Sequence, residues 1–270
     1  MQTQSEETRS AERGTRKNPV APLARAFLYQ FLARAYEYPS PETWKWMCDP
    51  EIKSSLYSAL DDALEAPSDL ARESLAKLRD SLMPDQYEMF LRSHHLAFGH
   101  AARGSCPLNE IEYGDLKADP LFQPHRLADL APFYRAFGLE ITEDGGERHD
   151  HFSIECEFMS VLHAKESNAI EEDADEESLS VCRDARKKFL REHIGRWAPA
   201  FTRRLARQSA APSMEALADF TRAFIESDCR RAGVPSGNED LLLRSVDESE
   251  ETLCASCGIQ SLPPGALTTT

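Results

Sequence analysis

The sequence predicts an all-α fold, a single bundle of about nine or ten helices, and three observations lead to it. Apolar residues recur at the i, i+3, i+4 and i+7 spacing of a buried helix face in most segments between residues 20 and 230. Ser or Asp followed by Pro, which is a helix-start signal, precedes several of these segments. No segment alternates apolar and polar residues as a half-buried strand does, and no internal repeat is present.

The first element expected is a helix that begins near Pro22. Residues 1–19 carry too little apolar surface to pack, so they are expected to form a disordered tail. Apolar residues then follow helical spacing from Leu23 to Ala35. The pattern stops at Tyr38 because a residue that precedes proline avoids the helical conformation.

Four further helix starts follow in the first half of the chain. Ser40 and Asp49 each precede a proline, which gives a capping side chain and a preformed first turn. The next starts are at 67–69 and at Pro84. His94 lies on the apolar stripe of the helix after Pro84, and we interpret it as a hydrogen-bonded core histidine rather than a ligand.

Residues 99–123 have no helical period, and a connection of this length inside a compact domain is usually functional or disordered. Its apolar and aromatic content favours an ordered loop that lies near the middle helix of the chain. Glu110, Glu112 and Tyr113 are the residues of this loop that could contact a ligand. A packed connector without any ligand is the alternative.

The segment 147–166 is the central helix of the predicted bundle. It follows an amphipathic helix over 125–137 and a turn, so a hinge is expected near 140–150. The segment is apolar nearly all round, as a helix buried in the middle of a helical domain is. Its polar strip is narrow, and the members of that strip are Ser153, Glu157, Ser160 and Ala164.

Two ionisable residues lie on the apolar side of this central helix. His151 and Glu155 are four residues apart and therefore neighbours on one face, and their burial is costly unless they find partners. Asp150 lies where an N-cap residue is expected. Two interpretations stand: a satisfied core pair with an Asp cap, or a polar site at the mouth of a groove, entered by the loop 143–146.

The C-terminal part continues the helical pattern. An acidic run over 171–177 is expected to be a solvated linker between two helical sets. Helical spacing resumes over 179–193, continues from Trp197, and returns between 213 and 229. Residues 231–270 are rich in Gly, Pro, Ser and acidic residues, so a mostly disordered acidic tail is expected.

The composition limits the classes of function. The 270 residues carry 31 basic and 46 acidic side chains, a net charge of −15, and phosphate binding needs a basic face, so nucleic acid is not expected as a partner. The charge is compatible with a basic peptide partner. No apolar run is long enough for membrane insertion, no secretory signal opens the chain, and seven scattered cysteines suit a reducing cytoplasm.

One enzymatic alternative comes from the motifs. The chain has no GxxxxGK[ST] loop, no GxGxxG and no GxSxG. Cys254 and Cys257 form a lone CxxC, whereas a structural zinc site needs four ligands, so neither a metal nor a cofactor is predicted. His149 and Asp150 form an HD dipeptide, which helical metal-dependent phosphohydrolases use together with an upstream histidine such as His94.

Four segments taken together resemble the TorD-like redox enzyme maturation chaperones. Residues 147–151 (ERHDH) resemble the ExPDH-type hinge motif of that family, with Arg148 in place of its proline. The IECEFMSVL that follows resembles the continuation of the motif into a buried helix. Residues 28–39 (LYQFLARAYEYP) and 127–139 (LADLAPFYRAFGL) resemble the first helix and the helix before the hinge.

Within that family, residues 106–114 (CPLNEIEYG) look like the branch that serves type II dimethyl-sulfoxide-reductase-like molybdoenzymes, which include chlorate and selenate reductases. The resemblance implies a cytoplasmic chaperone without catalytic activity, either a monomer or a dimer. It would bind the apo catalytic subunit of a molybdoenzyme until the molybdenum cofactor enters, and would shield the twin-arginine signal segment of that subunit.

The resemblance also implies where the client would bind. Asp150, His151 and Glu155 would form the polar centre of the site, with Glu147 at the hinge and the loop glutamates nearby. An apolar groove among helices suits an amphipathic or partly extended client segment. Acidic groups around its rim suit paired arginines through charge-assisted hydrogen bonds.

Overall fold

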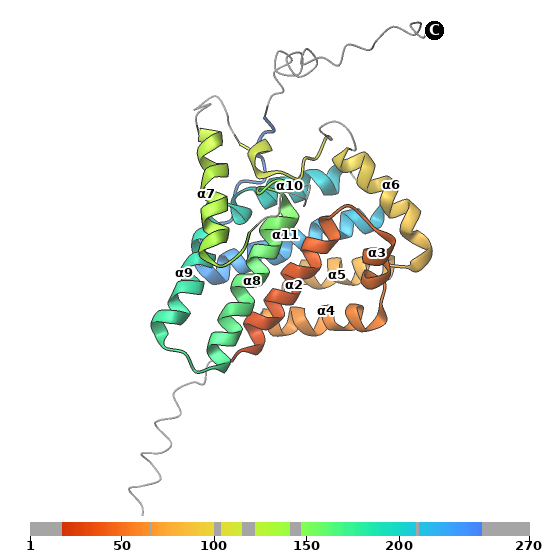
Figure 1. Cartoon of the computed structure of the whole chain (residues 1–270). Helices are drawn as coiled ribbons and strands as arrows, with labels where there is room; N and C mark the ends of the chain where they lie inside the picture. Colours follow the sequence, from red (N-terminus) through yellow and green to blue (C-terminus); the bar gives the residue numbers. More distant parts are fainter. Residues whose placement is uncertain are drawn as a thin grey trace, which may run out of the picture.

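In the computed structural model of the chain, helices α2 (Val20–Tyr36) and α8 (Phe152–Glu171) pack along each other at the centre of a helical bundle (Figure 1). Both are buried along most of their length, as the apolar character of the predicted central helix requires. The polar strip of α8 faces α2, since the hydroxyl of Ser160 donates a 2.8 Å hydrogen bond to the carbonyl of Ala26.

The structure describes residues 18–64, 66–99, 104–114, 122–140, 147–208 and 211–244, without the side chains of 122–127. Within these ranges it has ten α-helices, two 3-10 turns and no strand, which confirms the all-α prediction. The other helices are α3 (Pro41–Met47), α4 (Pro50–Ala63), α5 (Asp69–Ser81), α6 (Tyr87–Phe98), α7 (Phe122–Ala136), α9 (Glu176–Glu192), α10 (Ile194–Gln208) and α11 (Pro212–Ala232), with the 3-10 turns η1 (Pro84–Gln86) and η2 (Glu110–Glu112).

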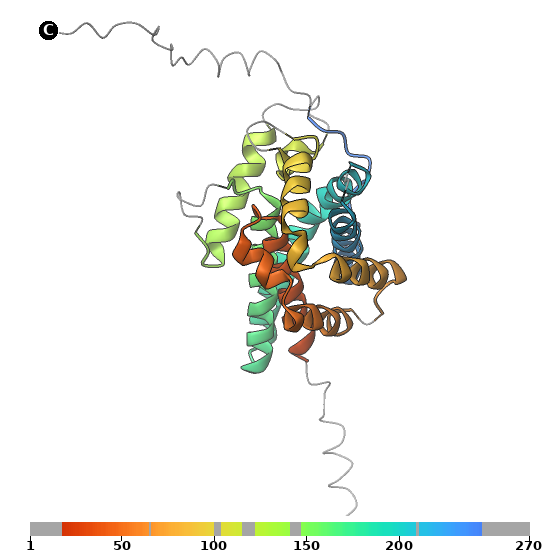
Figure 2. The ribbon, with the colours of Figure 1, turned by 90° about the vertical axis from the view of Figure 1, so that its right-hand side faces the viewer.

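The helices form two layers. Helices α4, α2, α8 and α9 follow one another across the front of Figure 1, and α5, α11 and α10 pack behind them. Figure 2, turned by 90°, shows α10 and α11 to one side of the α2–α8 pair. No helix among the described ones combines the length and the apolarity that crossing a membrane would need.

Three of the predicted helix starts have the capping side chains that the sequence predicts. Ser40 accepts a hydrogen bond from the backbone N–H of Thr43 at 3.0 Å, and Asp49 accepts one from Glu51 at 2.8 Å. Ser68 begins α5 in the same way, by accepting from the N–H of residue 71 at 3.2 Å. These caps satisfy donors that the first turn of a helix leaves without partners.

The acidic run over 171–177 lies at a helix boundary, as predicted. Helix α8 ends at Glu171, and Asp175 caps α9 by accepting a 2.7 Å hydrogen bond from the N–H of Ser178. Helices α8 and α9 pack against each other, so this run is a short turn within the bundle. Of the hinge expected near 140–150, residues 141–146 lie outside the described part of the chain.

The tail expected over 231–270 is ordered in its first part. Helix α11 continues to Ala232, and the following residues return to the loop that contains η2. The N–H of Gly114 donates to the carbonyl of Leu242 at 3.0 Å, and the N–H of Arg244 donates to the carbonyl of Glu112 at 2.9 Å. The prediction of disorder is therefore wrong for residues 231–244.

Gly237 explains how this segment can lie so close to α10. Its N–H donates a 2.9 Å hydrogen bond to the carbonyl of Gly195, and a Cβ at position 237 would lie 1.8 Å from the carbonyl oxygen of Arg196. Only glycine fits this approach. Residues 245–270, like 1–17 of the predicted N-terminal tail, lie outside the described residues.

Candidate functional site

The loop over 104–114 packs on the start of α8, as the sequence predicts. The N–H of Glu110 donates to the carbonyl of Asp150 at 2.9 Å, and the N–H of Phe152 donates to the carbonyl of Leu108 at 2.8 Å. Asn109 and His151 form an isolated antiparallel bridge between these two bonds. The predicted loop residues and the predicted polar centre are therefore adjacent in space.

The carboxylate of Asp150 is a structural clamp. One oxygen accepts from the Nε of Arg148 at 3.0 Å and from Asn109 at 3.2 Å. The other accepts from the Nη2 of Arg148 at 2.9 Å and from the backbone N–H of Ile111 at 3.1 Å. The expectation that Asp150 caps α8 and belongs to an accessible polar centre is wrong, because the residue is 1% exposed and its oxygens already bind four donors.

His151 is the N-cap of α8. Its Nδ1 accepts from the backbone N–H of Ser153 at 3.3 Å, so the ring proton of the neutral form belongs on Nε2, which lies 3.5 Å from the carboxylate of Glu147. Burial, followed by the charge of Arg148, lowers the pKa of His151 to about 4. The imidazole is therefore neutral at pH 7 and directs an N–H toward Glu147.

Glu155 is buried beneath this site and does not reach it. Its side chain is fully buried, and the indole N–H of Trp197 donates to its carboxyl oxygens at 3.0 and 3.3 Å. Burial, and then the charge of Glu110, raises the pKa of Glu155 well above its usual value. The expectation that Glu155 belongs to an accessible polar centre is wrong, and the first interpretation, a satisfied core group, applies to it.

Glu110 and Tyr113 anchor the loop. The carboxylate of Glu110 accepts from the Nδ1 of His193 and from the Nη2 of Arg196, both at 2.9 Å. Burial acts to raise the pKa of Glu110, but the hydrogen bond and charge of His193, together with Arg196, outweigh it and hold that pKa below its usual value. The hydroxyl of Tyr113 donates to the carbonyl of Pro107 at 2.8 Å, and the residue is 2% exposed.

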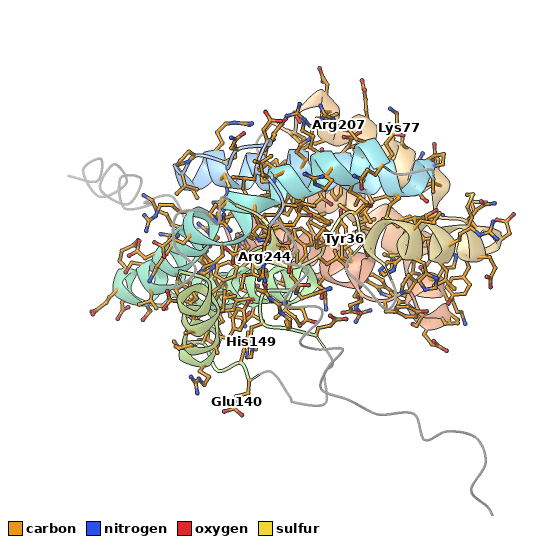
Figure 3. The ribbon with its side chains drawn as sticks, turned by 90° about the horizontal axis from the view of Figure 1, so that it is seen from above. Tyr36, Lys77, Glu140, His149, Arg207 and Arg244 are labelled. Atoms are coloured by element: carbon orange, nitrogen blue, oxygen red, sulfur yellow. The ribbon has the colours of Figure 1, made fainter. Side chains whose placement is uncertain are left out.

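A cavity of 550 Å³, here called the acidic cavity, lies between α2 and α8 beside the end of α7. Its floor is largely apolar and includes Ala33, Leu139, Ile154, Phe158 and Val161. Its charged residues are Arg34, Glu37, Glu140, Glu147 and Glu157. Figure 3 shows Glu140 on the side of the molecule opposite to Arg207 and Lys77.

Three glutamates of the acidic cavity have raised pKa values, mainly because they are partly buried. Burial, and then the charge of Glu157, raises the pKa of Glu37, and burial raises the pKa values of Glu147 and Glu157. The neighbouring cation, Arg34, stacks over the ring of Trp46 at 4.4 Å. Four carboxylates face one guanidinium in this lining, so an added cation would be stabilised there.

A second cavity of 390 Å³, here called the histidine cavity, adjoins the first, and Glu147 lines both. It lies between the end of α6, the loop with η2 and the start of α8. Its polar side chains include His94, Glu112, Arg148 and His151, and its aromatic ones are Tyr36, Tyr38 and Phe98.

Three of the seven predicted site residues, Glu112, Glu147 and His151, line a cavity. The predicted site did not include Glu37, Glu157 or His94, which also line these cavities. For Glu157 a signal existed, because Ser153, Glu157 and Ser160 of the predicted polar strip all line the acidic cavity.

His94 lies in the core, as predicted, and is only 5% exposed. Neither ring nitrogen has a partner at full hydrogen-bond geometry among the described residues, although a hydrogen bond with the backbone of Glu37 contributes to its pKa.

The metal-dependent phosphohydrolase alternative finds no support in the described residues. They contain no group of three or more His, Cys, Asp or Glu side chains that could hold a metal ion. Asp150, the acidic member of the HD dipeptide, already binds its four donors. The carbonyl of His149 accepts a 2.8 Å hydrogen bond from Tyr134, which is a structural contact.

Fold and site together define an all-helical protein with two adjoining cavities, one of them rich in carboxylates. A family model described as nitrate reductase delta subunit matches residues 64–203, which include the loop with η2 and the start of α8. The chain belongs to this family, and the predicted resemblance to the TorD-like chaperones is confirmed.

Three relatives show the range of similarity. The perchlorate reductase assembly chaperone protein of Dechloromonas aromatica is 25% identical over 209 residues, which are 76% of this chain and 88% of the relative. The selenate reductase assembly chaperone protein of Thauera selenatis is 29% identical over 163 residues, 60% of this chain and 81% of the relative. The chaperone protein TorD of Vibrio cholerae is 32% identical over 192 residues, 71% of this chain and 79% of the relative.

Proposed function

We propose that this protein is a cytoplasmic chaperone for the maturation of a molybdenum-cofactor oxidoreductase. It binds the apo catalytic subunit, including its twin-arginine signal segment, until the cofactor is inserted, and it acts by binding rather than by catalysis. The names of the relatives, which are assembly chaperones of perchlorate and selenate reductases, support this assignment. The observation that carries it is the acidic cavity between α2 and α8.

The chemistry of the acidic cavity suits a segment in which paired arginines precede an apolar stretch. Arginine guanidinium groups form charge-assisted hydrogen bonds with carboxylates, and they would stabilise the charged forms of Glu37, Glu147 and Glu157, whose pKa values burial raises. The apolar floor, with Ile154 and Val161, would cover apolar side chains of the same segment.

The predicted site residues then divide into two groups. Glu147, His151 and Glu112 are proposed to contact the client, because each lines a cavity. The other four, Asp150, Glu155, Glu110 and Tyr113, are proposed to hold the loop and the start of α8 in position.

Holding and release follow from differential affinity. A chaperone that binds only the apo form stabilises it by RT ln(1 + [L]/Kd), about 2.7 kcal/mol at a concentration one hundred times Kd. Cofactor insertion removes the form that the chaperone prefers, so the complex dissociates without any chemical step.

Calorimetric titration with a synthetic peptide tests the proposal. The peptide carries two adjacent arginines followed by an apolar stretch, and its control carries two glutamines instead. We expect the arginine peptide to bind at least about tenfold more tightly, a difference of about 1.4 kcal/mol, and to weaken as salt is added.

Matched variants locate the binding. The double change Glu147→Gln and Glu157→Gln removes two charges from the acidic cavity and is expected to abolish the preference for arginine. Glu177→Gln, on the exposed first turn of α9, is the control and should leave it intact. Equal affinity of the unchanged protein for both peptides contradicts the proposal.

A further inference from the structure

His94 is a buried polar side chain without a well-formed hydrogen bond to any described residue. It projects from α6 into the lining of the histidine cavity, and its ring packs against Phe98 at 4.6 Å and Tyr38 at 5.8 Å. Neither of its nitrogens has a partner at full hydrogen-bond geometry among the described residues, and the backbone of Glu37 is the one hydrogen-bonding group that acts on its pKa. An unmade hydrogen bond at a buried group destabilises the folded state, so the position is unfavourable for folding alone.

The protonation state of His94 defines what it can bind. Burial, followed by the nearby imidazoles of His95 and His151, lowers the pKa of His94 to about 4. A neutral imidazole has one N–H donor and one bare nitrogen acceptor, which point in different directions. A matching ligand must therefore accept a hydrogen bond at one place and donate one at another.

The other residues that line the histidine cavity limit which ligands it can bind. The start of α8 contributes His151, whose Nε2–H is directed toward the carboxylate of Glu147, and Glu112 also lines the cavity. Gly104 closes the wall next to Phe98, where a Cβ would lie 2.3 Å from the carbonyl carbon. The cavity thus mixes donors and acceptors between aromatic walls.

Main-chain peptide groups satisfy these requirements better than any charged group does. A guanidinium only donates and a carboxylate only accepts, so neither can match the donor and the acceptor of a neutral imidazole. An extended peptide offers successive C=O acceptors and N–H donors, which complement the two nitrogens of His94. Because Glu147 lines both cavities, one segment can enter both.

We propose that the histidine cavity is a second subsite, which binds main-chain peptide groups of the client segment through both ring nitrogens of His94. This assignment rests on the proposed function, because the segment is the one whose arginines bind in the acidic cavity. The protein would then recognise the extended backbone of the client segment as well as the charge of its arginines.

Titration of the arginine peptide into His94 variants tests the assignment. His94→Phe keeps the ring and removes both nitrogens, and we expect about a tenfold loss of affinity. His94→Gln keeps one donor and one acceptor and should recover part of that loss. Glu88→Gln, exposed on the first turn of the same helix, should bind like the unchanged protein.

Ester analogues of the peptide show whether the backbone is the ligand. Each analogue replaces one peptide N–H by oxygen. The analogue that lacks the N–H bound by His94 should bind the unchanged protein more weakly than the parent peptide does. The same analogue should bind His94→Phe with the affinity of the parent peptide, because this variant has no ring nitrogen to lose. The assignment is overturned if His94→Phe binds the parent peptide as tightly as the unchanged protein does. It is also overturned if every ester analogue weakens binding to both proteins equally. Water is then the only ligand left for the cavity.

Two further readouts separate the possible failures. If the arginine peptide does not bind the unchanged protein, the proposed function fails and this subsite fails with it. If the peptide binds but His94→Phe does not fold, ¹⁵N spectra of the histidine rings in the unchanged protein decide. Both nitrogens of His94 should shift on peptide addition, and binding without such a shift overturns the subsite alone.

Discussion

The indole N–H of Trp197 donates a hydrogen bond to the carboxyl group of Glu155 at 3.0 Å in the interior of the bundle. This pair joins α10 to α8, and neither residue lines the acidic cavity or the histidine cavity. Because burial and the charge of Glu110 raise the pKa of Glu155, the carboxyl stays protonated in the folded protein at pH values where it would ionise in the unfolded chain. The pair therefore links stability to pH.

Replacing Glu155 by Gln should make the protein less sensitive to alkaline pH. A raised folded-state pKa gives stability that is complete below the unfolded value, about 4.3, and is lost as pH rises toward the folded value, by at most about 1.4 kcal/mol per pH unit. Glu155→Gln cannot ionise, so its Tm relative to the unchanged protein should rise between pH 5 and pH 8. A constant difference across that range would show that Glu155 is ionised in the fold.

Removing the carboxylate of Glu110 should destabilise the protein, and more strongly at neutral pH than at acidic pH. Glu110→Ala leaves His193 and Arg196 without their buried partner, and breaking such a pair costs about 3–5 kcal/mol. Since its folded pKa is lowered, the contribution of Glu110 is present above the unfolded pKa of about 4.3 and is lost as pH falls through the folded value. Urea unfolding at pH 7 measures the loss, and it should shrink at pH values below the folded pKa.

Asp150→Ala should loosen the loop and not only the client site. The change removes the acceptor of the backbone N–H of Ile111 and of Arg148, at a cost of about 1–3 kcal/mol for the buried N–H. Hydrogen exchange over 104–114 should become faster, while exchange in α4 and α5 should not change. Unaltered exchange in the loop would mean that Asp150 does not clamp it.

His94→Phe should stabilise the protein while it weakens peptide binding. The substitution replaces an imidazole without a well-formed hydrogen bond by an apolar ring of similar size, so Tm should rise, by an amount equivalent to about 1 kcal/mol. A fall in Tm together with unchanged binding would show that His94 serves the fold. The opposite signs expected for stability and binding are typical of residues retained for function.

The periodic parts of the sequence were the predictable ones. Helix positions and caps such as Ser40, Asp49 and Asp175 follow from local chemistry, because a capping side chain bonds to N–H groups two or three residues away. The narrow polar strip of α8 also predicted a face, since Ser153, Glu157 and Ser160 line one cavity.

The sequence predicted where the site lies but not which of its side chains line a cavity. Spacing predicted that His151 and Glu155 are neighbours on one helix face, yet the burial of Glu155 depends on partners far away in sequence, such as Trp197. Whether a carboxylate is a clamp or a ligand-binding group depends on those long-range contacts. For the same reason, the pairing of residues 242–244 with the loop could not be predicted from composition.

A photo-crosslinking amino acid placed at Val161, in the lining of the acidic cavity, tests the central claim most directly. The variant is expressed in the native host, and the crosslinked polypeptide is identified by mass spectrometry. The same substitution at Val181, exposed on α9, is the control. We predict a crosslink from position 161, and not from 181, to the N-terminal segment of a reductase catalytic subunit. Crosslinks from both positions alike, or none to such a subunit, would contradict the account.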